Sequence, residues 1–217
     1  MSEPATRVIA IRHGETDWNV AARIQGQIDI GLNEAGRWQA QRLAGALAGE
    51  ALDAVYSSDL ARAQATAQAL ADQAGLAVRN DSGLRERAFG VFEGLTFAEI
   101  ELRFPAAALR WRQRDASFGP EGGETLAAFY QRAVASVAAL AERHRGQHIA
   151  VVTHGGVLDA LYRAATRAAL DAPRTWKVGN ASINRLLASQ AGLVLVGWAD
   201  NAHLDGPAPG VVGELAE

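Results

Sequence analysis

The sequence predicts a single domain of the α/β class, and three observations support this prediction. Short apolar segments alternate along the chain with longer segments of helical periodicity. Two of the apolar segments end abruptly in a histidine followed by glycine, and chemistry at the carboxyl end of a strand is typical of α/β folds. The length of 217 residues and the hydrophobic content of 49% fit one large domain with a sizeable core. No repeat, linker or shift in composition divides residues 1–217.

Capping and turn residues bound the elements expected in the first half of the chain. The expected strands are residues 8–11, 54–56 and 76–79. A helix over residues 33–49 is expected to stop at Gly49, and a second helix, with its N-cap within residues 57–59, is expected to stop at Gly75. This second helix has Arg62 in its first turn. Its expected buried face consists of Ala63, Ala67, Leu70 and Ala74.

The remaining elements are expected after residue 95. Thr96 and Glu99 form a capping box for a helix that must end before Pro105. The longest amphipathic helix follows; its apolar face consists of Leu126, Phe129, Ala133, Val134, Val137, Leu140 and Ala141. Residues 148–153 form a strand, and a helical pattern resumes at Val157. Residues 183–188 and 193–198 are expected to pair as a hairpin. Prolines and glycines predict a loosely ordered tail over residues 203–217.

Composition and charge exclude several classes of protein. A net charge of −3 and a pI near 6.0 argue against a nucleic-acid partner, which requires a basic surface. Without cysteine there are no disulfides, thiolate nucleophiles or cysteine-bound zinc. No apolar run approaches the roughly 20 residues that cross a bilayer, and the first residues lack a signal-peptide pattern. The expected compartment is therefore the cytoplasm, with no membrane partner.

A polar cluster follows the first strand, where Arg12, His13 and Gly14 precede Glu15, Thr16 and Asn19. An isolated histidine at such a turn is often structural. Here Arg12 offers a planar fork of donors suited to phosphate oxygens, and Gly14 is expected to let the backbone approach a ligand. His154 repeats the arrangement at a second strand end, where two glycines open a helix whose N-terminus favours an anion. Arg62 adds a second guanidinium near a helix N-terminus.

Several carboxylates are candidates for a general acid, and the residues alone leave Glu15, Glu86, Glu93 and Glu124 open. Glu15 and Glu93 are more simply interpreted as loop carboxylates that pair with nearby arginines. The other histidines, His144, His148 and His203, have no arginine-rich or glycine-rich neighbours and are expected to be structural or solvated. No metal is expected, because His13 and His154 lack helical metal-ligand spacing and acidic neighbours.

These segments together resemble the histidine phosphatase superfamily, which includes the phosphoglycerate mutases. The segments that carry the resemblance are Val8-Ile9-Ala10-Ile11-Arg12-His13-Gly14-Glu15-Thr16 with Asn19, Leu32-Asn33-Glu34-Ala35-Gly36, Tyr56-Ser57-Ser58-Asp59-Leu60-Ala61-Arg62-Ala63, Leu84-Arg85-Glu86-Arg87 with Phe89-Gly90 and Glu93-Gly94, and Val152-Thr153-His154-Gly155-Gly156. They occur in the family's order and span most of the chain. The resemblance implies a three-layer α/β/α sandwich with a mainly parallel, mixed sheet.

The resemblance also implies a reaction and a set of roles. His13 would attack phosphorus and carry the phosphate as phosphohistidine. Arg12, Arg62 and a protonated His154 would hold the phosphoryl oxygens, and Glu86 would protonate the leaving oxygen and then activate water. The remaining residues of the expected phosphate-binding set are Asn19, Gln25, Gly26 and Gly155. The implied partner is a small phosphomonoester, no cofactor is needed, and a homodimer is compatible with this fold.

Hydrolysis is the preferred reaction, and a 2,3-bisphosphoglycerate-dependent phosphoglycerate mutase is the alternative. Phe89 and Phe97 stand where the mutases resembled here have a tyrosine and a lysine, which removes a hydroxyl and a cation. The short link over residues 119–125 is similar to the broad-specificity phosphatase branch. Against this, the segment containing Arg112 and Arg114 is similar to the mutases' Trp-Arg-Arg. A third hypothesis is a non-catalytic module that binds phosphate esters. The complete set of site residues argues against it, because such a module would be expected to lose at least one of them.

Overall fold

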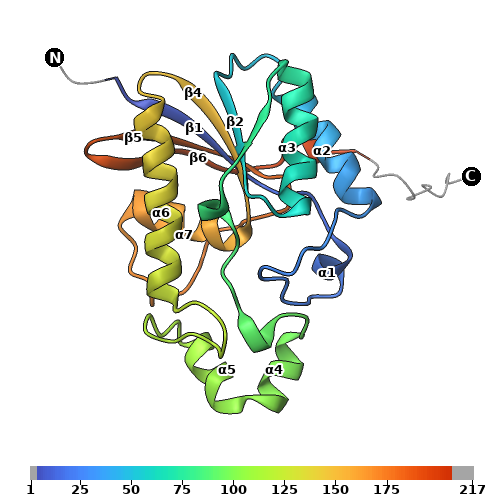
Figure 1. Ribbon diagram of the computed structural model, residues 1–217, viewed down its shortest axis with the longest axis vertical. Coiled ribbons are helices and arrows are strands. Elements are labelled where there is room, and N and C mark those ends of the chain that lie inside the picture. Colours follow the sequence, from blue (N-terminus) through green and yellow to red (C-terminus); the bar gives the residue numbers. More distant parts are fainter. Residues whose placement is uncertain (1–3, 207–217) are drawn as a thin grey trace, which may run out of the picture.

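The computed structural model describes residues 4–206 and forms one mixed sheet flanked by helices (Figure 1). The strands are β1 (Thr6–Arg12), β2 (Ala54–Ser57), β3 (Val78–Asn80), β4 (His148–Thr153), β5 (Ile183–Ser189) and β6 (Gly192–Asp200). The helices are α1 (Asp17–Val20), α2 (Glu34–Ala46), α3 (Ala61–Ala74), α4 (Phe97–Arg103), α5 (Pro105–Arg112), α6 (Leu126–Arg143) and α7 (Gly155–Thr166). Three short 3-10 helices are η1 (Ser82–Leu84), η2 (Gly90–Phe92) and η3 (Ala202–Leu204).

The sheet confirms the predicted mainly parallel, mixed arrangement. Its strand order is β3-β2-β4-β1-β5-β6. The four strands β3, β2, β4 and β1 are parallel, whereas β5 is antiparallel to β1 and β6 is antiparallel to β5. The predicted hairpin is therefore confirmed as β5 and β6. The carboxyl ends of β1, β2 and β4 meet at one edge, where ligands bind in open α/β sheets.

Side chains of the central strands alternate between two cores. On β1, Val8 and Ala10 belong to a buried cluster with residues of α6 and α7, and Ile9 and Ile11 belong to another with residues of α2 and α3. Figure 1 shows these helix pairs on opposite sides of the sheet, so the predicted three layers are confirmed. Nearly continuous apolar sequence in β1 follows from burial of both faces.

A third cluster lies below the sheet in Figure 1, where α4 and α5 form a small lobe. Its buried members are Phe92, Ile100, Ala108 and Phe118. The capping box of α4 is confirmed, since Thr96 Oγ1 accepts from Glu99 N and Glu99 Oε2 accepts from Thr96 N. This helix ends before Pro105, as predicted. Two helices were not predicted from the sequence: α1, and α5, which begins at Pro105 because proline fits the first helical turn.

Two predicted helix boundaries are wrong. Helix α2 ends at Ala46 with Leu47 as its C-cap, so Gly49 is not the stop. Helix α3 has Leu60 as its N-cap and no side-chain cap; instead Asp29 Oδ1 accepts a hydrogen bond from Ala61 N at 2.7 Å. A carboxylate from a distant loop thus replaces the expected local cap, which sequence spacing cannot reveal.

Other details of α3 and of the chain end also differ from expectation. Gly75 is confirmed as the C-cap of α3, in the left-handed region at φ 66°. The predicted buried residue Ala74 is exposed, and Ala71 is buried in its place. Of the predicted tail, His203 lies in η3, where its carbonyl accepts from Arg42 Nε at 2.8 Å. Residues 207–217 lie outside the described residues. No helix of the described part combines the length and apolarity that crossing a membrane requires.

Gly14 has a packing role that differs from the predicted ligand approach. A Cβ at Gly14 would lie 2.4 Å from the carbonyl oxygen of Gly36, and one at Gly36 would lie 2.0 Å from that of Glu15. The turn after β1 and the first turn of α2 therefore touch backbone to backbone. Glycine is needed at both positions by this contact, because no side chain fits between the two segments.

This contact predicts opposite effects of alanine at two glycines of α2. Gly36→Ala should lower the free energy of unfolding by about 1–3 kcal/mol, because the added methyl group overpacks against backbone. Gly45→Ala should raise it by about 0.5–1 kcal/mol, because nothing lies within 4 Å of its Cβ position and alanine favours the helix. Denaturant unfolding of both variants measures the difference. Equal effects at the two positions would contradict the backbone contact.

Candidate active site

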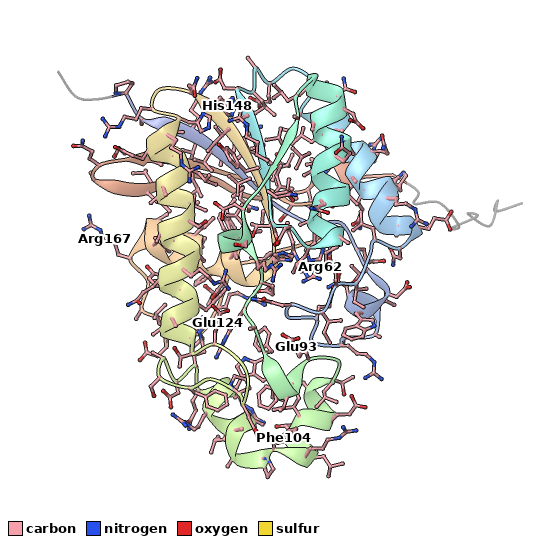
Figure 2. All side chains as sticks on the ribbon, in the orientation of Figure 1. Arg62, Glu93, Phe104, Glu124, His148 and Arg167 are labelled. Carbon is pink, nitrogen blue, oxygen red and sulfur yellow. The ribbon has the colours of Figure 1, made fainter. Side chains whose placement is uncertain are left out.

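A cleft with a volume of about 640 Å³ lies at the carboxyl ends of β1 and β4. Figure 2 shows Arg62 at the lower end of the sheet and Glu93 below it. Most of the predicted site residues line this cleft: Arg12, His13, Asn19, Gln25, Gly26, Arg62, Glu86 and Gly155. His154 is not among the lining residues, because its side chain is completely buried next to His13.

The two histidines are brought together by the parallel pairing of β1 with β4. Arg12 is in register with Thr153, and His13 N donates to Thr153 O at 2.9 Å. Both side chains leave the sheet at the same edge, so the ring centroids of His13 and His154 lie 5.1 Å apart. Adjacent parallel strands with the same strand-histidine-glycine ending must place their histidines side by side.

The protonation state of His13 suits a nucleophile. Its Nδ1 lies 2.7 Å from the carbonyl oxygen of Gly14, which only accepts hydrogen bonds, so Nδ1 carries the proton. Nε2 then keeps its lone pair. Burial, and next the positive charges of Arg12 and Arg62, lower the pKa of His13 well below its ordinary value. The imidazole is therefore neutral at pH 7, with one nitrogen able to attack an electrophile.

Arg62 is a buried cation and Arg12 a half-buried one, and backbone carbonyls orient both. Arg12 Nη1 donates to Val178 O at 2.6 Å, and Arg62 donates to Gly26 O at 2.7 Å and to Ile28 O at 2.9 Å. The Nε atoms of both arginines are buried without a hydrogen-bond partner among the described residues. Burial lowers the pKa of Arg12 to about 10 and also lowers that of Arg62, yet both remain charged at pH 7. Unpaired buried donors of this kind fit an oxyanion.

The protonated His154 implied by the resemblance disagrees with its surroundings. Burial, then His13 and the two arginines, lower the pKa of His154 well below its ordinary value, so its imidazole is neutral at pH 7. Its Nε2 lies 2.8 Å from Ser58 Oγ, while Nδ1 is buried without a partner among the described residues. Even a neutral imidazole has an N–H to donate. The structure therefore favours a neutral His154 over the cationic form that the resemblance implies, because burial and then the neighbouring positive charges oppose its protonation.

Glu86 is the one of the four candidate carboxylates that lines the cleft. Its Oε1 accepts from Arg87 N at 2.8 Å and its Oε2 from Gly156 N at 2.9 Å, at the first turn of α7. A Cβ at Gly156 would lie 2.1 Å from Glu86 Oε1, so this glycine makes room for the carboxylate. The structure thus gives a physical reason for the choice of Glu86 that the residues alone left open.

The other three carboxylates hold loops in place. Glu93 Oε1 accepts from Gln27 N and Phe89 N, Glu15 Oε1 accepts from Asn33 Nδ2, and Glu124 pairs with Arg132 and accepts from Ala88 N. The expectation that Glu15 and Glu93 pair with arginines is therefore wrong. Glu93 instead joins the loop after α1 to the loop after η1, and both loops line the cleft.

The weaker candidates of the phosphate-binding set have mixed roles. Asn19 Oδ1 accepts from Thr16 N, Thr16 Oγ1 and Asn180 Nδ2, so this atom caps α1 and fixes the side chain at the cleft. Gln25 is buried, and its Oε1 has no partner in the described part of the chain. Gly26 contributes its carbonyl to Arg62 and has φ 53°, where a Cβ would meet Glu93.

Several residues of the site were missed by the sequence analysis. Ser58 contacts His154, and Asp159 binds Arg114 at 2.7 Å and Arg163 at 3.0 Å. Arg174 lines the cleft from the irregular segment between α7 and β5. Ser58 was assigned only a capping role, and no sequence pattern marks Arg174. Residues 4–206 contain no group of three or more side chains arranged to hold a metal ion.

Comparison with known proteins identifies relatives of the whole domain. Residues 8–201 match the model of the histidine phosphatase superfamily (branch 1). The chain is 41% identical over 204 residues to phosphoglycerate mutase-like protein 4 of Arabidopsis thaliana, with 91% of this chain and 86% of that protein covered. It is 38% identical over 203 residues to the metal-independent phosphoserine phosphatase of the same plant, with 92% and 83% covered.

A solved structure is similar to this chain in both fold and sequence. A mycobacterial glucosyl-3-phosphoglycerate phosphatase, determined in complex with VO3, has a TM-score of 0.81 and 36% sequence identity to this chain. The match covers 90% of this chain and 99% of that one. Both the sequence and the backbone arrangement are thus shared over nearly the full length.

The surroundings of His13 predict its titration. Since burial and two cations oppose protonation, its imidazole should stay neutral when the pH falls to about 5.5, whereas an unperturbed histidine is largely protonated there. Side-chain ¹⁵N NMR measures this directly. Arg12→Gln removes a neighbouring positive charge and should raise the pKa of His13. Half-protonation of His13 near pH 6.5 in the unsubstituted protein would contradict this account of the pocket.

Proposed function

This chain belongs to the histidine phosphatase superfamily, branch 1, and from that premise we propose that it hydrolyses a small phosphomonoester through a phosphohistidine on His13. Relatives named as phosphatases support hydrolysis of phosphoric monoesters as the activity. The observation that carries the assignment to His13 is the 2.7 Å contact between its Nδ1 and Gly14 O, which places the proton on Nδ1 and leaves Nε2 with a lone pair beside Arg12 and Arg62.

In the first half of the reaction His13 Nε2 attacks phosphorus. The N–P bond forms as the P–O bond to the leaving group breaks, and protonated Glu86 supplies the proton that the leaving oxygen needs. Arg12 and Arg62 hold the equatorial oxygens through donors that include their unpaired Nε atoms. His154 acts as a neutral donor: Ser58 Oγ–H donates to its Nε2, so that Nδ1 carries the hydrogen toward the phosphoryl group.

In the second half water replaces His13. Glu86, now a carboxylate, takes a proton from the attacking water as the new O–P bond forms and the N–P bond breaks. The electron pair returns to His13 Nε2, and inorganic phosphate leaves. No step requires a metal, because the arginines neutralise the phosphoryl charge; one relative is itself named metal-independent. The substrates in the relatives' names, phosphoserine and glucosyl-3-phosphoglycerate, are candidates here.

The wall of the cleft near α5 favours hydrolysis over the mutase reaction. Phe89 and Trp111 line the cleft with ring centroids 5.6 Å apart, and Phe97 packs against Trp111 at 5.5 Å. This aromatic wall and the Phe97 ring behind it thus replace the hydroxyl and the cation that the mutases have at positions 89 and 97. Arg112 forms an ion pair with Glu101, and Arg114 forms one with Asp159. These two arginines therefore offer a second anionic group less attraction than free guanidinium groups would.

The link over residues 119–125 is compact, as the phosphatase interpretation expects. Glu124 N donates to Ala88 O at 2.9 Å, and a Cβ at Gly90 would lie 1.9 Å from Glu121 O. The link therefore lies directly on the loop that follows Glu86. Two further expectations stay predictions: a cytoplasmic location and a homodimer, for which the exposed edge strand β6 offers a pairing surface.

The phosphohistidine predicts a specific chemical trap. Rapid denaturation of the enzyme with ³²P-labelled substrate should capture acid-labile, base-stable phosphate on His13, and His13→Ala should abolish this labelling together with activity. His148, at the opposite end of the sheet in Figure 2, provides the control, and His148→Gln should keep the label. Labelling of a serine, or of the His13→Ala variant, would refute the mechanism.

The aromatic wall predicts the fate of the phosphohistidine. With 3-phosphoglycerate, in the presence and absence of 2,3-bisphosphoglycerate, free phosphate should form faster than 2-phosphoglycerate. Glu86→Gln should slow alkyl phosphates far more than aryl phosphates, because alkoxide leaving groups need a proton. Coupled assays for phosphate and for each phosphoglycerate isomer measure both effects. Isomer formation many times faster than phosphate release would establish the mutase alternative.

A further inference from the structure

Positive charge is concentrated at the cleft in a chain whose overall charge is −3. Seven arginines line it, and the carboxylates that line it are Glu86 and Asp159. The arginines are Arg12, Arg23, Arg62, Arg87, Arg112, Arg114 and Arg174. A phosphate group bound by Arg12 and Arg62 uses only the inner part of this charge. The partners of the outer arginines therefore decide what else the cleft can bind.

Most of these arginines already have partners. Three are in ion pairs: Arg23 with Glu99, Arg112 with Glu101 and Arg114 with Asp159. Three are held by backbone carbonyls: Arg12 by Val178, Arg62 by Gly26 and Ile28, and Arg87 by Phe118 and Glu124. Within the described residues, Arg174 is the member of the seven with neither a hydrogen bond nor an ion pair, and it is exposed to solvent.

The segment that carries Arg174 is fixed on both sides. Before it, buried Arg163 donates to the carbonyl oxygens of Ala169 and Ala172. After it, the Trp176 ring stacks on Tyr162 with centroids 3.9 Å apart and lies beneath the guanidinium of Arg163 at 4.8 Å. Such anchoring places the backbone of Arg174 before any ligand binds, which reduces the entropy that binding would cost.

The same segment is tied directly to the phosphate pocket. Val178 lies four residues after Arg174, and its carbonyl oxygen accepts a hydrogen bond from Arg12 Nη1 at 2.6 Å. The segment that carries Arg174 therefore contacts the arginine next to His13. The positive charge of Arg174 is also near enough to contribute to the lowered pKa of Arg12. A ligand whose phosphate contacts Arg12 therefore has Arg174 in the same cleft, close enough for its charge to act on the rest of the ligand.

We infer that Arg174 is a specificity-determining residue, which binds a second anionic group on the substrate's leaving portion. The inference rests on the proposed function for the position of the phosphate. A guanidinium fork suits either a carboxylate or a second phosphate, and both are distinguished from a neutral leaving group by the same test. The substrate class is thus a phosphomonoester that carries an additional negative charge near its ester oxygen.

Binding in a variant that cannot turn over substrate tests this inference. In the His13→Ala background, calorimetry gives the affinity for glycerol 3-phosphate, for 3-phosphoglycerate and for propane-1,3-diyl bisphosphate, which differ in carrying no second anion, a carboxylate or a phosphate. Arg174→Gln should weaken binding of either or both doubly anionic ligands about tenfold. This is the low end of the loss expected for a charge-assisted hydrogen bond, because Arg174 is exposed to solvent. Binding of glycerol 3-phosphate should change less than about twofold. Arg174→Lys should restore part of the loss, because it keeps the charge without the fork.

Arg167→Gln is the matched control, since it removes the same charge from the start of the same segment. Figure 2 shows Arg167 to the left of α6, on the side away from Arg62. This substitution should therefore leave all three affinities unchanged. Equal losses for all ligands in Arg174→Gln, or no loss for any, would overturn the inference. The proposed function is judged separately, by phosphate release and labelling of His13 with all three ligands in the unsubstituted enzyme. Selective loss of binding without such turnover would support Arg174 and reject the proposed reaction.

Discussion

The parallel pairing of β1 with β4 is the constraint on which the site depends. Each strand is buried on both faces and must end where its apolar residues end, so the following histidine and glycine leave the sheet at a common edge. The hydrogen bond from His13 N to Thr153 O continues the ladder by one residue and holds the nucleophile against β4. A shift of one residue in this register would move each side chain of β1 to the other face of the sheet. It would also separate His13 from His154.

A buried surplus of positive charge is the electrostatic consequence of that arrangement. Arg12 and Arg62 are brought into a cleft where carboxylates are scarce, and backbone carbonyls from two loops orient them. Burying charge in this way is costly unless a counter-charge arrives. Burial, together with this surplus, keeps both histidines neutral, which the nucleophile requires. The surplus also leaves N–H donors whose best partner is a phosphoryl group.

Close backbone approach explains more of the glycine pattern than ligand binding does. Gly14 and Gly36 allow the turn after β1 to touch α2, and Gly156 leaves space for the Glu86 carboxylate at the start of α7. These contacts position His13 and Glu86 relative to one another from different layers of the fold. The glycines of the motifs therefore act on the reaction indirectly, through the distance between elements.

The sequence by itself determined the α/β alternation, the hairpin, and the grouping of Arg12, His13 and Arg62, because periodicity and short motifs are local properties. It also located the capping box at Thr96. Only the tertiary structure decided which carboxylate faces the cleft, that His154 is neutral, and that Asp29 caps α3. It likewise revealed Arg174 as an unpaired cation beside Arg12. Each of these depends on burial or on a partner distant in the chain, and neither burial nor a distant partner can be read from spacing along the sequence.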